Sequence, residues 1–542
     1  MSKVVILAIN AKYVHSSLAV RLLAESVSQY ALLPHDVAVT EANINQDDND
    51  IAGQVAAYKP DIVGISTYIW NAKKLPNIIE ELRKLLPKAI VVLGGPEASH
   101  NAAYWIDRGV DFVLRGEGER SFPTLLDTLE SGAAPEYVPG LCWRQGNEIR
   151  CKPEAEVSND FIDPFNETCL AAIKGKIVYI EASRGCPFRC AFCLSGNRAV
   201  KFFPLDMVKE QLAKLSKADV RIVKFVDRTF NCDAKRAYEM FDYIIGLDTP
   251  NCFHVEVAAD LFDERTLQLL ATAPPGRIQI EAGLQSFFEP TLEAICRKTN
   301  LAKAVKNIRT ILRSGNIHVH ADLIAGLPHE TLSDFQNSFD KAYAIGAHTL
   351  QLGFLKMLHG SELRENEKSI IFAEEPPYEI ISSPWMSVSD LEILKRTESA
   401  LQHTYNKGRF LSTLQYVLSA AELRPFSLYH ALGEVVSASG LPLGDYAAQL
   451  YIFCKELRGV EQDKLLECMI CDWLGMVKGA NMPQFLKIAD KQQLAQITET
   501  AEVILGRKLR RNETAVLPSG KGVYVDSEKR DAVTGLYAVV CI

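Results

Sequence analysis

The stretch that decides the fold is Cys186-Pro187-Phe188-Arg189-Cys190-Ala191-Phe192-Cys193, which holds three cysteines in the spacing C-x3-C-x2-C. The apolar run 177–182 before it predicts a buried strand, and Ser183-Arg184-Gly185 predicts a turn. The cysteines are therefore expected on a loop at the C-terminal end of a strand. Thiolates on one loop can converge on a single metal centre.

Two metal centres and one metal-free arrangement compete for this loop. Structural zinc needs a fourth protein ligand, usually from a nearby second Cys or His pair, and residues 194–231 contain neither residue type. A 4Fe–4S cluster held by three thiolates leaves one iron open to a small molecule, so the spacing favours that cluster. Three buried thiols, or a redox pair, are the plainer alternative.

With Phe192 between its last two cysteines, the motif resembles the radical S-adenosylmethionine (SAM) enzymes. The resemblance implies that Cys186, Cys190 and Cys193 hold a 4Fe–4S cluster whose open iron binds the amino and carboxylate groups of SAM. It also implies that Phe192 contacts SAM, and that a low-potential electron donor such as flavodoxin or ferredoxin reduces the cluster.

The composition is that of an ordinary globular chain. The 542 residues are 48 % hydrophobic and 23 % charged, and no apolar run reaches the roughly 18 residues of a membrane span. The N-terminus enters a strand without a signal peptide's cleavage site, and the 13 cysteines are irregularly spaced. We therefore expect a cytoplasmic protein with no membrane partner. The net charge of −8 argues against a protein that coats nucleic acid over its whole surface.

Residues 1–140 are predicted to form a Rossmann-like, doubly wound α/β domain. Apolar runs alternate with amphipathic stretches, which is typical of a parallel sheet with helices on both faces. Ligands bind such domains beyond the C-terminal ends of the strands. The predicted strands are Val4–Asn10, Val37–Ala42, Ile62–Thr67, Ile90–Leu93 and Phe112–Leu114, with helices such as Leu18–Tyr30 and Leu75–Leu86 between them.

The strand ends of this domain carry glycines, hydroxyl groups and carboxylates. Taken alone, they support only an α/β domain with a ligand at its strand ends. The segments Gly94-Gly95-Pro96-Glu97 and Gly116-Glu117-Gly118-Glu119, upstream of the cysteine loop, resemble the cobalamin-binding radical SAM enzymes. The resemblance implies cobalamin contacts from Asn10, Tyr13, His15, Ser16, Ser66, Thr67, Tyr68, Trp70, Gly94, Gly95, Pro96, Glu97, Gly116, Glu117 and Glu119.

The lower face of the cobalt has two sets of candidate partners. The chain lacks the D-x-H-x-x-G loop with which many cobalamin proteins supply a histidine. Tyr68 and Trp70 are therefore expected to cover that face, and His15 is the competing candidate as a ligand. Ordinary packing of the two aromatic rings is the plainer alternative.

Residues 141–175 are predicted to be a linker with a short hairpin around Gln145-Gly146-Asn147. Cys142, Cys151 and Cys169, which lie on it, are expected to be packing residues. Residues 176–365 then repeat strand and helix six times, which predicts a partial (β/α)6 TIM barrel with its chemistry at the strand C-terminal ends. The six strands are expected at Ile177–Ala182, Ile222–Val226, Phe253–Val257, Ile278–Ala282, Val319–Ile324 and Thr349–Phe354.

Polar residues mark the strand ends of this predicted barrel. The segments from Glu281 to Ser286 and from Asp322 to Glu330 resemble the E-x-G-x-Q-S and D-x-I-x-G-L-P-x-E segments of the radical SAM family. Asp227 stands where that family often has GGE, and departs from it. For each acidic residue, a helix cap is the alternative. The SAM contacts implied are Phe192, Asp227, Glu256, Glu281, Gln285, Ser286 and Asp322.

Residues 366–542 are predicted to form a mostly helical C-terminal domain with a basic tail. Apolar residues recur at helical spacing between 389 and 501. Cys468 and Cys471 form a C-x2-C pair in that pattern, so a second cluster is an alternative to simple packing. The basic run 506–511 is either a solvated face or a site for RNA or an anionic substrate. The region resembles an uncharacterised extension of some cobalamin-dependent radical SAM proteins.

The resemblance implies a cobalamin-dependent radical SAM methyltransferase. A 5′-deoxyadenosyl radical would take a hydrogen from an unactivated carbon, and methylcobalamin would deliver the methyl group. One alternative is a cobalamin-binding radical SAM enzyme that performs a non-methylating cyclisation or rearrangement. Another is a non-catalytic cobalamin and iron–sulfur sensor. The substrate is either a modified tRNA base or a small molecule.

Overall fold

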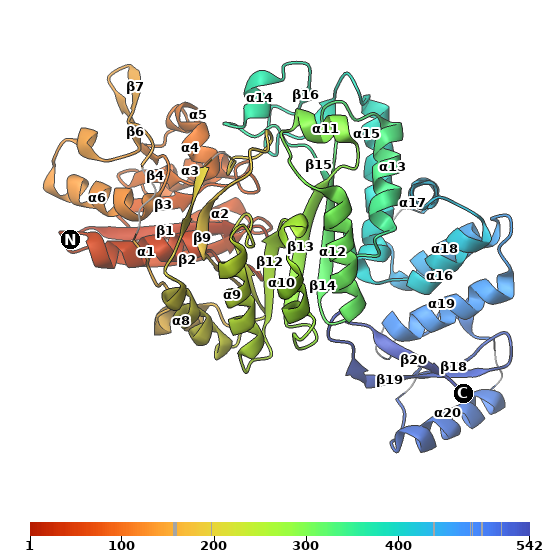
Figure 1. Cartoon of the computed structure of the whole chain (residues 1–542). Coiled ribbons are helices and arrows are strands. Elements are labelled where there is room, and N and C mark those ends of the chain that lie inside the picture. The colour runs from red at the N-terminus through yellow and green to blue at the C-terminus, as the bar shows by residue number, and fades with distance from the viewer. Residues whose placement is uncertain are drawn as a thin grey trace. The chain divides into compact units, whose positions relative to one another are not determined.

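The computed structural model describes residues 1–155, 160–196, 198–436, 440–476, 479, 481–488, 491–510 and 512–542. Figure 1 shows the helices and strands of the chain. They belong to two compact units. The first consists of Met1–Glu256 and Lys356–Ile380, and the second of Val257–Leu355 and Ile381–Ile542. The chain therefore leaves the first unit at residue 256 and returns to it for one short segment.

The first unit opens with a seven-stranded sheet in the order β2-β1-β3-β4-β5-β6-β7. Strands β1 to β5 are parallel, and β6 and β7 are antiparallel to their neighbours. The strands are β1 (Lys3–Asn10), β2 (Asp36–Asn43), β3 (Ile62–Ser66), β4 (Ile90–Gly94), β5 (Phe112–Leu114), β6 (Leu141–Gln145) and β7 (Glu148–Cys151). The helices are α1 (Leu18–Tyr30), α2 (Asp48–Ala56), α3 (Leu75–Leu85), α4 (Pro96–His100), α5 (Ala102–Ile106) and α6 (Gly118–Ser131), with η1 (Pro135–Tyr137).

Strand β1 explains why the chain begins with an unbroken apolar run. Successive side chains of a strand point to opposite faces of the sheet. Val5, Leu7 and Ile9 join the core on the α2 and α3 side, whereas Val4 and Ile6 join the core with α1 and α6. Both faces are covered, so both sets of side chains must be apolar. The predicted Rossmann-like domain is confirmed.

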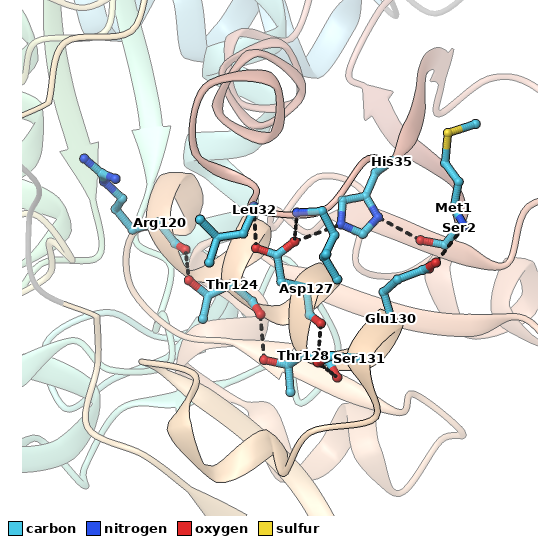
Figure 2. A network of polar contacts seen from close by, with 11 residues as sticks. Met1, Ser2, Leu32, His35, Arg120, Thr124, Asp127, Thr128, Glu130 and Ser131 are labelled. Carbon is cyan, nitrogen blue, oxygen red and sulfur yellow. Dashed lines mark hydrogen bonds and ion pairs between the residues drawn. The ribbon is translucent and has the colours of Figure 1, made fainter.

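A network of polar contacts lies at the N-terminal ends of β1 and β2 (Figure 2). The Asp127 carboxylate on α6 accepts hydrogen bonds from the backbone N–H groups of Leu32 and Leu33, at 2.8 and 3.0 Å. Its Oδ1 also lies 3.1 Å from Nε2 of His35, whose Nδ1 lies 2.8 Å from Oγ of Ser2. These contacts fix the turn from α1 to β2 on α6. They lie where β1 and β2 begin, so they do not involve the C-terminal ends of these strands.

The predicted linker differs from the structure at its start. The hairpin around Gly146 is present, but its strands β6 and β7 extend the first sheet. Cys142 and Cys151 face each other across this hairpin and form a disulfide, so the expectation that they are only packing residues is wrong. Directly opposed residues on antiparallel strands have Cβ atoms ~5 Å apart, which brings two thiols within reach. Cys169 is a buried free thiol.

The cysteine motif lies on a two-stranded ribbon. Strand β9 (Ser183–Cys186) pairs antiparallel with β10 (Arg198–Phe202), so the prediction of a turn at Ser183-Arg184-Gly185 is wrong. Backbone pairing with β10, which no local signal encodes, holds this stretch extended. The rest of the first unit contains the parallel strands β8 (Ile177–Ile180), β11 (Ile222–Phe225) and β12 (Cys252–Val257). It also contains α7 (Glu167–Ala172), α8 (Leu205–Ser216), α9 (Ala234–Gly246), α14 (Glu362–Asn366) and β16 (Ile371–Phe372).

The second unit contains the parallel strands β13 (Ile278–Gln285), β14 (His318–Ala325) and β15 (Thr349–Phe354). Each unit thus contains three of the six parallel strands predicted for this region. The predicted partial-barrel fold is confirmed. The helical elements η2 (Ala259–Leu261) and α10 (Glu264–Leu270) come before β13. Helices α11 (Glu289–Ala294) and α12 (Leu301–Ser314) lie between β13 and β14, and α13 (Leu332–Tyr343) lies between β14 and β15.

The C-terminal region is mostly helical, as predicted, and ends in a three-stranded antiparallel sheet. No helix in the described part of the chain is both long and apolar enough to span a membrane. The elements of the C-terminal region are β17 (Ile380–Ser382), α15 (Val388–His403), η3 (Tyr405–Lys407), α16 (Leu411–Ala420), α17 (Pro425–Val435), α18 (Leu443–Lys455), α19 (Gln462–Met476), η4 (Gln484–Leu486), α20 (Lys491–Leu505), β18 (Thr514–Val516), β19 (Gly522–Arg530) and β20 (Tyr537–Cys541).

Candidate active site

A cavity of about 660 Å³ lies in the first unit, at the C-terminal ends of β1, β3 and β4. This is the point where the strand order reverses, between β1 and β3, which is where open α/β sheets bind ligands. Most of the predicted cobalamin contacts line it. They are Asn10, His15, Ser16, Ser66, Tyr68, Trp70, Gly94, Gly95, Pro96, Gly116, Glu117 and Glu119.

Three predicted cobalamin contacts are not among the lining residues. The Tyr13 side chain is 77 % exposed to solvent. Thr67 is fully buried, and its backbone N–H donates to the carbonyl of Gly94 at 2.7 Å. Glu97 is also buried, and its carboxylate accepts a hydrogen bond from Tyr378 at 2.5 Å. These side chains are placed to support the cavity wall or to meet solvent.

The glycine at position 95 shapes that wall. Its φ is +102°, and a Cβ there would lie 2.6 Å from the carbonyl oxygen of Thr67. Only glycine adopts this conformation so close to another backbone. The turn into α4 can therefore lie directly against the end of β3, with Gly94, Gly95 and Pro96 bordering the cavity.

Both candidate sets for the lower face of cobalt line the cavity. The rings of Tyr68 and Trp70 stack at 4.2 Å, and the Trp70 indole N–H donates to the carbonyl of Ile9. Burial raises the pKa of Tyr68 to about 12, so its hydroxyl stays protonated. Nδ1 of His15 lies 2.6 Å from the Tyr179 hydroxyl. Burial, together with Lys12 and Lys224, lowers the pKa of His15, which favours the neutral imidazole that metal ligation needs.

Arg184 on β9 is a lining residue that sequence reasoning missed. Its Nη1 lies 2.8 Å from Glu117, its Nε lies 2.9 Å from Glu181, and its Nη2 pairs with Glu119. One guanidinium therefore joins the loop after β5, the residue after β8 and the cysteine strand. Burial raises the pKa of Glu181 to about 7, although Arg184 opposes that shift. Its position beside Cys186 is the sequence signal that could have found it.

The three motif cysteines lie on β9 and the loop that follows it. Cys186 and Cys190 are buried, and Cys193 is half-buried. The Cys193 N–H donates to the Cys190 carbonyl at 3.0 Å, which turns the loop tightly. Within the described residues, no group of three or more His, Cys, Asp or Glu side chains is placed to hold a metal ion, so these sulfurs share a loop without meeting at one point. A donor set of three thiols, without a histidine or carboxylate, still fits an iron–sulfur cluster.

The predicted SAM contacts of the first unit differ in their placement. Glu256 at the end of β12 lines the cavity, whereas Phe192 and Asp227 are not among the lining residues. Asp227 is 2 % exposed and accepts hydrogen bonds from the Ala182 N–H at 2.9 Å and the Ser183 hydroxyl at 2.5 Å. Burial raises its pKa to about 6. Asp227 thus holds the junction between β8 and the cysteine strand.

The remaining predicted SAM contacts lie in the second unit, on β13, directly after it at Ser286, and on β14. Alternate residues of these strands are only partly buried, and Glu281 and Asp322 belong to that face. A Cβ at position 283 would lie 2.3 Å from the Gln285 amide nitrogen, so Gly283 leaves room for that side chain to fold back. Ser286 is fully buried, and its hydroxyl donates to Glu330 at 2.5 Å.

The structure argues against a ligand at two other sequence features, the C-x2-C pair and the basic run. Cys468 and Cys471 lie on α19, and burial raises the pKa of Cys471 to about 12, which disfavours the thiolate. In the basic run, Arg507 pairs with Asp526 at 2.8 Å, and Lys508 pairs with Glu502 at 2.7 Å. Arg511 lies outside the described residues.

Three family models match the chain. They are the B12 binding domain over residues 4–126, the radical SAM superfamily over residues 180–342 and a protein of unknown function (DUF4080) over residues 367–517. The first two contain the cavity strand ends and the cysteine motif, respectively. The third covers most of the predicted C-terminal extension.

Relatives with named activities match at low identity. The cobalamin-dependent radical SAM methyltransferase TokK of Streptomyces tokunonensis is 26 % identical over 334 residues, covering 57 % of this chain and 49 % of TokK. The anaerobic magnesium-protoporphyrin IX monomethyl ester cyclase of Cereibacter sphaeroides is 23 % identical over 311 residues, covering 54 % of this chain and 51 % of the cyclase. The chain therefore spans about half the length of these relatives.

Solved structures share the fold. The radical SAM methyltransferase TsrM from Kitasatospora setae, solved with cobalamin and a [4Fe–4S] cluster, aligns with a TM-score of 0.57 at 18 % identity, over 70 % of this chain and 79 % of TsrM. The cobalamin-dependent SAM radical enzyme OxsB, solved with aqua-cobalamin and SAM, aligns with a TM-score of 0.58 at 14 % identity, over 87 % of this chain and 78 % of OxsB.

Proposed function

We propose that this chain, which belongs to the radical SAM enzymes that carry a B12-binding domain, methylates an unactivated carbon of its substrate. Its cofactors are a 4Fe–4S cluster, SAM and cobalamin. One observation carries the proposal: a single cavity is lined by the strand ends of the B12-binding domain and by Gly185 and Ser195 beside the motif cysteines. Reactive groups bound in one cavity meet at high effective concentration.

In this proposal, the side chains of the chain bind and orient the reactants. When bound, the cluster and SAM supply a 5′-deoxyadenosyl radical, and cobalamin supplies the methyl group. Cys186, Cys190 and Cys193 hold the cluster, and Glu256 offers a carboxylate to the amino group of SAM. Tyr68 and Trp70, which stack on each other in the cavity lining, would pack against bound cobalamin, and His15 is the competing candidate there.

The test of the cluster assignment removes the three thiolates. The C186A/C190A/C193A variant should bind no cluster iron and form no 5′-deoxyadenosine from SAM under a low-potential reductant, because no ligand for the cluster remains. Iron content and chromatography of the SAM products measure both effects. The matched control is C468A/C471A, which removes a cysteine pair from α19 and should keep the cluster. Retained SAM cleavage in the triple variant contradicts the assignment.

A second candidate function is a non-methylating cyclisation or rearrangement, which the match to the cyclase favours. The two reactions differ in their products. Methyl transfer consumes a second SAM to remethylate cobalamin and releases S-adenosylhomocysteine together with 5′-deoxyadenosine. The cyclisation releases 5′-deoxyadenosine alone. A sensor would bind cofactors and release neither product, so one anaerobic product analysis separates the three.

For the substrate, we propose a small molecule rather than tRNA. In the described residues of the basic run, Arg507 and Lys508 are paired with carboxylates, which weakens the case for a phosphate-binding face. A flavodoxin or ferredoxin is the proposed electron donor, and the cytoplasm is the proposed location.

A further inference from the structure

The segment Lys356–Ile380, here called the strap, is the part of the chain that returns to the first unit. It holds α14 and β16, and it contains the first residues of the DUF4080 match. Nothing in its sequence marks it as part of a cofactor site. Its contacts nevertheless reach both the cavity wall at α4 and the cysteine loop.

Tyr378 is the first contact of the strap with the cavity wall. Its side chain is 3 % exposed, and its hydroxyl donates to Oε1 of Glu97, which is 5 % exposed, at 2.5 Å. Its own backbone is held by two hydrogen bonds, from the Met357 N–H to the Tyr378 carbonyl and from the Tyr378 N–H to the Glu375 carbonyl, both at 2.9 Å. A hydroxyl and a carboxylate buried together depend on each other, because burial removes the water that could replace either partner.

The strap approaches α4 at two further points. A Cβ at Gly360 would lie 2.2 Å from Nδ1 of His100, so the strap touches the end of α4 closely. His359 lies 3.4 Å from the Asn101 amide. The Arg364 guanidinium lies 4.9 Å from the ring of Tyr378, a distance at which cation and ring attract. The contact with Glu97 is thus one of a set that fixes the strap on α4.

The strap also meets the cysteine loop, through α14. The backbone N–H of Leu363, in the first turn of α14, donates to the carbonyl of Ala191 at 2.8 Å. Ala191 lies between Cys190 and Cys193. Ser361 caps α14 by accepting the Arg364 N–H at 3.3 Å, which holds the turn that presents Leu363. One segment therefore binds the loop of the motif cysteines and the helix next to the cavity wall.

We propose that Tyr378 is a positioning residue for the cofactor cavity. Through Glu97 it holds the wall Gly94-Gly95-Pro96, and through the strap it sets the distance between that wall and the cysteine loop. This inference rests on the proposed function for its consequence, the fit of cobalamin against the cluster. The hydrogen bond itself exists whether or not the chain binds cobalamin.

The experiment uses the full chain with its reconstituted cluster and compares wild type with Y378F. Phenylalanine keeps the ring and removes the hydroxyl, so the fold and the iron content should be retained. Hydrogen exchange of the backbone N–H groups in residues 94–101, of which Pro96 has none, should become faster, since the wall loses its anchor. Hydroxocobalamin should bind about tenfold more weakly, the size expected when one partner of a buried hydrogen bond is lost. The visible spectrum of bound cobalamin should shift.

The matched control is Y429F in the second unit. Tyr429 is also fully buried, and its hydroxyl lies 3.4 Å from that of Tyr343. This variant loses a buried hydroxyl too, but it should leave exchange at 94–101 and cobalamin affinity at wild-type values. E97Q keeps an acceptor oxygen for Tyr378 and should stay close to wild type, whereas E97A should match Y378F. The double variant Y378F/E97A should be no worse than either single variant.

The outcomes separate the two proposals. If wild type binds no cobalamin, the proposed function loses its cobalamin part, and the exchange data alone decide whether Tyr378 anchors the wall. If wild type binds cobalamin and Y378F binds it equally well with an unchanged spectrum, Tyr378 does not position the cofactor. Unchanged exchange at residues 94–101 in Y378F overturns the inference in either case.

Discussion

Glu330 shows what one buried carboxyl group implies about protonation. It is fully buried, and its Oε1 accepts hydrogen bonds from the hydroxyls of Ser286 and Ser338, at 2.5 and 3.0 Å. Its Oε2 has no hydrogen-bond partner among the described residues. Burial raises its pKa from 4.5 to about 7, because the charged form loses water that two hydroxyls do not fully replace. The protonated form is therefore the one that this site favours.

The sign of the pH dependence follows from that pKa. Between pH 4.5 and 7, the folded state holds the Glu330 proton and the unfolded state does not. The stabilisation is complete below about pH 4.5 and is lost as the pH rises through 7. We expect the free energy of unfolding of wild type, relative to E330Q, to decrease as the pH rises from 5 to 8. Urea unfolding at several pH values measures the difference, with E392Q on an exposed face of α15 as control. An increase with pH contradicts the assignment.

The ribbon of β9 and β10 illustrates how one element can depend on a single cation. Arg184 is 17 % exposed and pairs with three carboxylates. They belong to Glu117 in the loop after β5, Glu119 in the first turn of α6, and Glu181 directly after β8. Removing the guanidinium leaves three buried carboxylates close together. Removing one partner of a buried ion pair is strongly destabilising, because the remaining charge loses both its partner and water.

R184Q should therefore lower the free energy of unfolding by about 3–5 kcal/mol, as measured by urea denaturation. R184K should recover part of the loss, because it restores the charge without the planar fork. R144Q on β6 is the control: the pair of Arg144 with Asp107 is 43 % and 59 % exposed, and exposed pairs contribute at most about 1 kcal/mol. If R184Q and R144Q lowered the free energy of unfolding equally, the interpretation that Arg184 stabilises three buried carboxylates would be contradicted.

Over the whole molecule, charge argues against a polyanionic substrate. The net charge is −8, and in the described basic run Arg507 and Lys508 are each paired with carboxylates. Protein–RNA affinity comes largely from cations that neutralise phosphates, and it falls steeply with salt. We expect no specific binding of tRNA to the full chain at about 0.15 M salt, where the Debye length is ~8 Å. Fluorescence anisotropy across a salt series measures it, and tight binding with a steep salt slope would restore the tRNA hypothesis.

Short stretches of the sequence determined several features of the fold and of the candidate site. The apolar run 4–9 predicted β1, because a strand covered on both faces has no polar side. The spacing of Cys186, Cys190 and Cys193 pointed to an iron–sulfur cluster, because three thiolates on one short loop limit the metals that the loop can hold. Glycines at strand ends pointed to the cavity wall, because Gly95 needs a backbone conformation that other residues avoid.

Other features exist only in the tertiary structure. Arg184 and Glu119 are 65 positions apart, and Tyr378 and Glu97 are 281 apart, so no local pattern pairs them. Asp227 and Ser286 were expected to face SAM, yet their polar atoms bind neighbouring protein groups. Composition and hydrophobic periodicity predict which residues belong to a strand or a loop. The direction of each side chain, and the partner it meets, depend on how distant segments pack, and that packing alone brings the strap to the cavity wall.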